Sequence, residues 1–175
     1  MKTEETGSLG GGVVNDGPTS GGARWDQRYI QLARYIGSWS KDRSTKVGCV
    51  IVGSLNEIRA IGYNGFVRGA DDDDDEKHRR PNKYVWTEHA ERNAIYHAAL
   101  VGISLKGCRM YLPWFPCVDC ARAIVQCGIA ELIAIEPDVN HERWGADFSN
   151  SIELLKEAGI TVRYLPEPPQ NSSVP

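Results

Sequence analysis

The chain has 175 residues, of which 41% are hydrophobic and 25% charged, with a net charge of −3 and a pI of about 5.8. This composition is typical of one soluble globular domain that can bury a full hydrophobic core. The acidic balance argues against a protein that holds a polynucleotide, which needs basic surface. No apolar run approaches the ~18 residues of a membrane span. We therefore expect neither a nucleic-acid polymer nor a membrane among its partners.

The cysteines and the two ends of the chain suggest its location and its organisation. Five cysteines are an odd number and lie in apolar segments, unlike a secreted disulfide framework, which indicates a reducing, cytoplasmic setting. Residues 1–22 are rich in Gly, Ser and Thr and lack the apolar stretch of a signal peptide, so they predict a disordered N-terminal tail. Residues 23–166 are then one domain. Residues 167–175 are a loose, proline-rich C-terminal tail.

The first structured part should be a helix followed by a β-hairpin. Apolar residues recur at helical spacing from about residue 24 to Gly37. The uninterrupted apolar run 47–52 predicts a strand that is covered on both faces, and residues 58–63 predict the strand that returns. Gly62 and Gly65 should let the backbone approach another group closely.

The remainder alternates between strands and helices. Five consecutive aspartates, 71–75, predict an exposed loop. Their charge is more simply explained by solvation than by a regulatory or metal-binding role. Strands are then expected at 108–112, 132–135 and 160–165, and helices at 89–100, 117–126 and 148–158. The order α-β-β-α-β-α-β-α-β predicts an α/β fold, a three-layer α/β/α sandwich around a five-stranded mixed sheet.

Two short motifs carry the candidate chemistry: His89-Ala90-Glu91 and Pro116-Cys117-Val118-Asp119-Cys120. The spacing of Cys117 and Cys120 places both sulfurs on one side of the first turn of a helix, whose positive end stabilises thiolates. His89 also stands at the start of a predicted helix. A catalytic zinc usually takes three protein ligands and keeps a fourth position for water. We therefore predict a Zn²⁺ site formed by His89, Cys117 and Cys120.

Glu91 is left over as a carboxylate that the metal does not need. A water held by zinc becomes a nucleophile near neutral pH, and Glu91 is placed to move protons between that water and a substrate. The two cysteines alone could instead be a redox pair or half of a structural zinc site, but Cys108 and Cys127, the candidate further ligands, fit a core better. The two motifs in this order are the signature of zinc-dependent nucleobase deaminases.

Longer stretches extend this match. Residues 44–52, 62–69, 89–95 and 116–120 resemble the deoxycytidylate (dCMP) deaminase family of the zinc-dependent cytidine/deoxycytidylate deaminase superfamily, and the likeness runs from about residue 24 to 165. The resemblance implies a cytidine deaminase-like fold and a deaminase domain at 23–166. It further implies conversion of dCMP to dUMP and ammonia, and a homo-oligomer, either a hexamer or a dimer.

The resemblance also suggests which residues bind the substrate. Asn64 would hydrogen-bond the sugar, and the backbone at Ala90 would read the pyrimidine edge. Trp114 and Phe115 would border the base, although packing in the core explains them equally well. The resemblance does not choose among the cations that could neutralise a 5′-phosphate, which are Lys46, Arg68, Arg79 and Arg80. In some relatives the loop that here holds the aspartates helps to form an effector site for deoxynucleoside triphosphates.

Two other hypotheses stay open on the sequence alone. One is deamination of another nucleotide, a nucleoside, or a base in tRNA or DNA, which the acidic net charge disfavours for polynucleotides. The other is a zinc-stabilised binding domain that keeps the fold without turnover. Glu91 argues against the second, because a structural zinc site has no use for a carboxylate at that position.

Overall fold

The main sheet of the protein is mixed and five-stranded. The computed structural model describes residues 20–167, so most of both predicted tails lies outside the described residues. The strands run in the order β2-β1-β5-β6-β7; β1 is antiparallel to β2 and β5, and β5, β6 and β7 are parallel. This confirms the predicted fold class. Their bounds are β1 Gly48–Val52, β2 Ile58–Tyr63, β5 Arg109–Leu112, β6 Glu131–Ile135 and β7 Thr161–Leu165.

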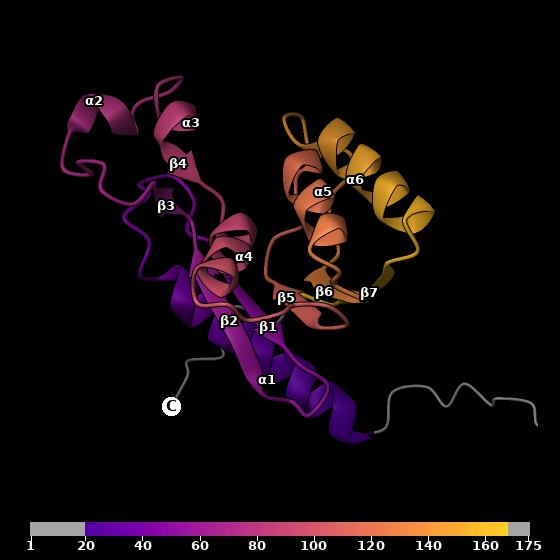
Figure 1. The fold of residues 1–175 in the computed structure, drawn as a ribbon. Helices are drawn as coiled ribbons and strands as arrows, with labels where there is room; N and C mark the ends of the chain where they lie inside the picture. The colour runs from indigo at the N-terminus through magenta and orange to yellow at the C-terminus, as the bar shows by residue number, and fades with distance from the viewer. Residues whose placement is uncertain (1–19, 168–175) are drawn as a thin grey trace, which may run out of the picture.

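Helices cover both faces of this sheet. Figure 1 shows α1 on one face and α4, α5 and α6 on the other, which gives three layers. Among residues 20–167, no helix combines the length and the apolar character that crossing a bilayer requires. The bounds of these helices are α1 Ser20–Gly37, α4 Ala90–Leu100, α5 Val118–Gln126 and α6 Gly145–Glu157.

Strand β1 is apolar throughout because it lies inside the sheet, between β2 and β5, and is covered on both faces. Cys49 and Ile51 belong to the hydrophobic core beneath α4, α5 and α6, whereas Val50 and Val52 belong to a second core formed with α1. All five residues of β1 are buried. A strand that is covered on both faces has no position left for a polar side chain.

Helix α4 packs closely onto β2, and Gly62 makes this possible. A Cβ atom at Gly62 would lie 2.3 Å from the Ala90 carbonyl oxygen and 2.5 Å from the Ala94 nitrogen. The predicted close approach is therefore confirmed at Gly62. It does not occur at Gly65, where the nearest atom to such a Cβ is 3.9 Å away, on the Tyr63 ring.

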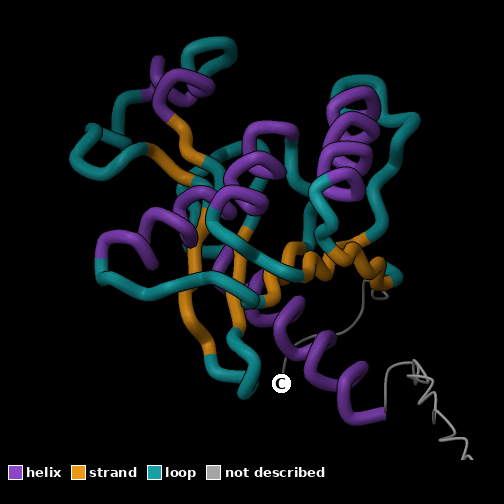
Figure 2. The backbone as a smooth tube through the Cα atoms, turned by 45° about the vertical axis from the view of Figure 1, so that its right-hand side comes forward, coloured by secondary structure: helices purple, strands orange, loops and turns teal. Residues whose placement is uncertain are grey.

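The segment between β2 and α4 has more structure than the exposed loop that its charges predict. It contains β3 (Gly65–Phe66), α2 (Asp75–His78), α3 (Lys83–Trp86) and β4 (Thr87–Glu88). Figure 2 shows the short β3–β4 ladder set apart from the main sheet. Helix α6 likewise begins at Gly145, before the predicted start at residue 148.

The run of aspartates docks this segment onto the connection between α1 and β1. Lys41 Nζ lies 2.7 Å from Asp72 Oδ1, and Arg43 Nη2 lies 2.5 Å from Asp75 Oδ1. The side chains of both pairs are largely exposed, so each pair contributes little to stability. Through these pairs the segment contacts the connection between α1 and β1.

Candidate active site

His89, Cys117 and Cys120 converge on one point. Their ligand atoms all lie within 4.8 Å of one another, and no other such group of three occurs among residues 20–167. His89 Nδ1 is 3.4 Å from Cys117 Sγ and 3.5 Å from Cys120 Sγ. Nitrogen and sulfur ligands around a tetrahedral zinc stand about 3.5 Å apart, given ordinary bond lengths. The three side chains therefore fit a zinc ion, and neither Cys108 nor Cys127 joins them as a fourth ligand.

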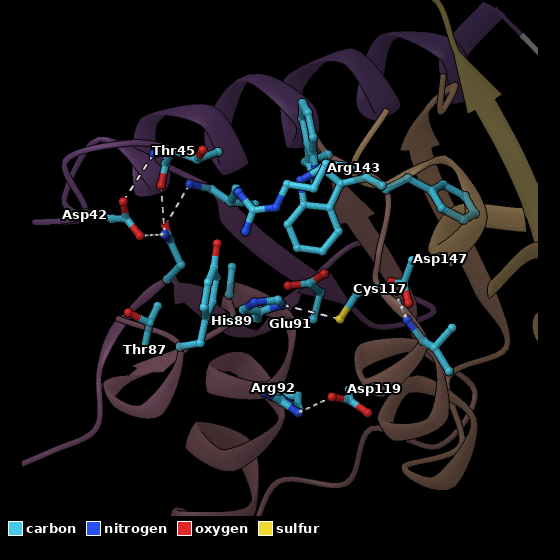
Figure 3. Close-up of a pocket in the computed structure, with 18 of the residues that line it drawn as sticks. Asp42, Thr45, Thr87, His89, Glu91, Arg92, Cys117, Asp119, Arg143 and Asp147 are labelled. Atoms are coloured by element: carbon cyan, nitrogen blue, oxygen red, sulfur yellow. Dashed lines mark hydrogen bonds and ion pairs between the residues drawn. The ribbon is translucent and has the colours of Figure 1, made fainter. Parts of the chain in front are cut away.

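The helix starts explain this convergence. His89 is the N-cap residue of α4 and Cys117 that of α5, and neither side chain makes a capping hydrogen bond. Both side chains are directed instead toward the candidate metal site (Figure 3). The positive ends of two helix dipoles thus point to one place, where they favour thiolates.

The two sulfurs lie so close that they differ in acidity when no metal is bound. Hydrogen bonding with Cys120 lowers the pKa of the Cys117 thiol to about 4, although burial opposes the shift. The same hydrogen bond and burial raise the pKa of Cys120. A divalent cation removes this asymmetry because it stabilises both thiolates.

Glu91 lies beside this group without belonging to it. Its side chain is 4% exposed, and Figure 3 shows it between His89 and Cys117. Burial raises the pKa of the Glu91 carboxyl. A carboxyl whose pKa is raised by burial holds a proton more readily than an exposed one, which suits a group that accepts and then releases a proton during a reaction.

A cavity of about 370 Å³ opens over these residues. That volume is sufficient for a small-molecule ligand. Of the residues predicted to bind zinc, to transfer protons or to contact the sugar and base, all but Cys120 line it, and Cys120 is buried. Those lining residues are Asn64, His89, Ala90, Glu91, Trp114, Phe115 and Cys117.

Asn64 is held rigidly in the cavity wall. Its amide nitrogen donates to Thr45 O at 2.8 Å and to Asp42 Oδ2 at 3.3 Å, and its Oδ1 accepts from Val47 N at 2.8 Å. Both amide protons are therefore used within the protein. The remaining lone pair on Oδ1 is the group that it can offer to a ligand.

A buried ion pair stands behind Asn64. Lys83 Nζ lies 2.8 Å from Asp42 Oδ2, and the two residues are each 8% exposed. Burial tends to raise the pKa of Asp42, but hydrogen bonds from Lys83, Ser44 and Thr45 prevail and lower it to about 2. Sequence reasoning missed this pair because its members are 41 residues apart and share no motif.

The two aromatic residues before Pro116 have different surroundings. Phe115 is 2% exposed and packs edge-on against Phe148, with ring centroids 5.9 Å apart. Trp114 is 40% exposed and is the more accessible of the two. Both line the cavity, so Phe115 can form its floor while Trp114 forms part of its rim.

Charged side chains fix the two metal-binding helices. Arg92 Nε donates to Glu88 Oε1 at 2.6 Å, and the same oxygen accepts from His89 N at 3.0 Å. Arg92 also reaches across to Asp119 Oδ2 on α5, at 3.8 Å. Asp147 Oδ2 accepts from Val118 N at 3.1 Å, which ties the start of α6 to the first turn of α5.

The cations around the cavity differ from those proposed for a phosphate. Of the four proposed, only Arg80 lines the cavity; Lys46, Arg68 and Arg79 do not. Sequence reasoning missed Arg143, which lines it together with Tyr84 and Trp144. The only signal in the sequence was the place of Arg143 and Trp144 in the loop after β6, since loops at the carboxyl ends of parallel strands commonly bind ligands.

Comparisons with known proteins agree with this geometry. Residues 23–136 match the family model for the cytidine and deoxycytidylate deaminase zinc-binding region. The chain is 39% identical over 145 residues to an uncharacterized deaminase in the luxG 3′ region of Aliivibrio fischeri, covering 82% of this chain and 95% of that protein. It is 37% identical over 145 residues to the deoxycytidylate deaminase of Homo sapiens, covering 79% of this chain and 78% of that protein.

A solved structure shares the fold. It is a dCMP deaminase from the cyanophage S-TIM5 in complex with dCMP and dUMP, with a TM-score of 0.67 and 23% sequence identity, covering 81% of this chain and 97% of that chain. The family match and the donor set together identify the metal as zinc. The chain therefore belongs to the cytidine and deoxycytidylate deaminase family, whose zinc-binding region it carries at residues 23–136.

Proposed function

We propose that this protein deaminates a free pyrimidine nucleotide, with dCMP and water giving dUMP and ammonia. The observation that carries the proposal is the buried Glu91 carboxyl, which lies in a ligand-sized cavity beside the three candidate zinc ligands. Relatives named deoxycytidylate deaminase, 37% identical over most of the chain, support the choice of substrate.

The reaction divides its tasks among four side chains. His89, Cys117 and Cys120 hold the zinc, which when bound supplies a water activated for hydrolysis at neutral pH. Glu91 takes one proton from the water and gives it to the ring nitrogen while the water oxygen bonds to the ring carbon that carries the amine. Glu91 then moves the second proton, from the resulting hydroxyl, to the departing amine. The carbon–nitrogen bond to the amine breaks, the oxygen stays on the ring carbon as a carbonyl, and ammonia leaves. Because Glu91 is buried, bulk water does not compete for these protons.

Four further residues place the nucleotide. Ala90 is the first residue of α4, so its N–H has no acceptor within the helix and is available to the pyrimidine edge. Asn64 offers its remaining Oδ1 lone pair to the sugar. Trp114 and Phe115 border the base. The rigid hydrogen bonding of Asn64 supports this role, because a fixed acceptor costs little ordering on binding.

We further propose that the protein is a homo-oligomer, a dimer or a hexamer, in the cytoplasm. Exposed apolar side chains lie on α4 (Tyr96 and Leu100), at its C-cap (Val101) and at the start of β2 (Ile58), which supports an interface there. Ligand thiols that must stay reduced support a cytoplasmic setting. Sedimentation velocity over a range of protein concentrations tests the oligomer, and a monomer throughout would contradict it.

A substrate panel tests the function. Zinc-loaded protein is incubated with dCMP, CMP, deoxycytidine, cytidine and adenine nucleotides, and ammonia release is followed. We expect the highest kcat/KM with dCMP. Activity confined to nucleosides would refute the nucleotide assignment. A fully zinc-loaded protein that deaminates none of these compounds would indicate a non-catalytic binding domain.

A further inference from the structure

The cavity contains two arginines that have no carboxylate partner among residues 20–167. They are Arg80 and Arg143. The other two cations that line the cavity are already paired, Lys83 with Asp42 and Arg92 with Glu88. The positive charge that is available to a ligand therefore resides on Arg80 and Arg143.

Arg143 is the better positioned of the two. Its guanidinium carbon lies 5.1 Å from the ring centroid of Tyr84 and 5.0 Å from that of Trp144, and both rings also line the cavity. Contact with aromatic faces restrains the guanidinium while its in-plane N–H groups stay available as donors. No hydrogen bond or ring contact restrains Arg80 within the described residues.

The Arg143–Tyr84 contact also joins two walls of the cavity. Tyr84 belongs to α3, which precedes the metal-binding helix α4, and Arg143 belongs to the loop before α6. Figure 3 shows Arg143 on one side of His89 and Glu91, with the Arg92–Asp119 pair on the opposite side. A ligand whose reacting end lies at Glu91 can therefore extend toward Arg143 without meeting a paired charge.

We propose that Arg143 is a specificity-determining residue that binds the 5′-phosphate of the nucleotide, and that Tyr84 and Trp144 hold it ready. This inference rests on the proposed function and adds the group that selects a nucleotide over a nucleoside. A guanidinium presents paired N–H donors that match two oxygens of a phosphate. Because the stacking contacts exist before the ligand arrives, little side-chain entropy remains to be lost on binding.

The test compares zinc-loaded variants in two measurements, kcat and KM for dCMP and the calorimetric Kd of dUMP. Arg143→Ala should raise KM and Kd about ten- to a hundredfold, the range expected for a lost charged hydrogen bond, with a smaller change in kcat. Arg143→Lys should recover part of the loss. Tyr84→Leu, which removes one ring, should raise both constants by a smaller factor.

A matched control comes from α1. Arg28 also packs on an aromatic ring, at 5.0 Å from the centroid of Trp25, but does not line the cavity. Arg28→Ala should leave KM and Kd as in the wild type. Measurements of zinc content and of urea unfolding establish that each variant is folded. If Arg143→Ala does not fold, Arg143→Lys is compared with the wild type instead.

Two results would overturn the inference. Arg143 variants that bind dUMP like the wild type while Arg80→Ala loses binding would assign the phosphate to Arg80 instead. Arg143 variants that lower kcat without changing KM or Kd would show a role other than phosphate binding. In both cases the wild-type protein still deaminates dCMP, so the proposed function stands. A wild-type protein that neither deaminates dCMP nor binds dUMP would overturn both proposals.

Discussion

Lys83 Nζ lies 2.8 Å from one carboxylate oxygen of Asp42 and 3.0 Å from the other, in a wall of the active-site cavity. Asp42 also accepts from Asn64 and from the backbone of Ser44 and Thr45. One ion pair thus connects the α1–β1 connection, the end of β2 and α3. Removing this ion pair should lower both the stability of the fold and the affinity for substrate.

Lys83→Met should destabilise the protein strongly. It leaves the Asp42 carboxylate buried without its cation, and breaking a buried pair in this way costs about 3–5 kcal/mol. Urea unfolding at neutral pH measures the change in free energy. Lys41→Met is the comparison, because it breaks an ion pair whose side chains are 61% and 39% exposed, and it should cause a much smaller, salt-sensitive change. Equal effects of the two substitutions would contradict this account.

The Asp42 carboxylate should make stability depend on pH in the acid range. Its folded-state pKa of about 2 lies below the ordinary value of 3.8, so it stabilises the fold fully above pH 3.8 and loses this effect as the pH falls towards 2. The contribution is about 2 kcal/mol. The unfolding free energies of wild type and Asp42→Asn should therefore converge between about pH 4 and pH 2. Loss of zinc in acid affects the wild type and the variant alike. A difference in unfolding free energy that stayed constant over this pH range would refute the assignment.

Glu91→Gln should separate zinc binding from turnover. The amide keeps the size of the carboxyl but cannot transfer protons, so kcat for dCMP should fall about 10²–10⁴-fold. Metal analysis should still find zinc at the wild-type level, because Glu91 is not one of the three ligands. Glu153→Gln on the exposed side of α6 is the control and should change neither. Loss of zinc from Glu91→Gln would mean that the carboxyl supports the metal.

Asp147→Ala should weaken zinc binding without touching a ligand. Asp147 accepts the Val118 N–H and so fixes the turn that carries Cys117 and Cys120. Residues that orient metal ligands typically change affinity about 10–100-fold when removed. Competition with a chromophoric chelator measures the zinc Kd. Asp147→Asn keeps an acceptor oxygen and should lose less; equal losses would point to the charge rather than to the hydrogen bond.

Gly62→Ala should disturb the start of α4. The added methyl group would overlap the Ala90 carbonyl oxygen, so β2 and α4 must move apart, at a cost of about 1–3 kcal/mol. Because His89 is the N-cap residue of α4 and Glu91 lies in its first turn, kcat for dCMP should fall together with stability. Gly65→Ala meets nothing closer than 3.9 Å and serves as the control. Wild-type urea stability in Gly62→Ala would show that the helix can shift freely.

Most of the fold follows from local patterns in the sequence. The apolar run of β1 and the helical spacing of α1 identify their elements, because burial on both faces or on one stripe leaves a regular trace. The segment containing β3 and β4 leaves no such trace, since a two-residue strand is too short to show alternation. The early start of α6 was missed because Gly145 resembles a loop residue and Trp144 provides no side-chain cap.

The same distinction holds for the active site: some of its residues can be predicted from local sequence, and others cannot. The candidate zinc ligands lie in motifs whose spacing predicts their chemistry, so the sequence alone indicates His89, Cys117 and Cys120. The Lys83–Asp42 pair and the placement of Arg143 depend on segments that only the folded chain brings together. For the same reason sequence position could not separate Arg80 from the other candidate cations.

The uncapped starts of α4 and α5 imply a trade-off between stability and catalysis. An N-cap position normally holds Ser, Thr, Asp or Asn, and replacing such a residue costs a helix about 1 kcal/mol. His89 and Cys117 occupy these positions without capping their helices. Before zinc arrives, the two helices therefore begin less stably than their lengths allow. The substitution His89→Asp would stabilise the metal-free fold but abolish the metal site. Selection for thermostability alone would therefore favour changes that remove the activity.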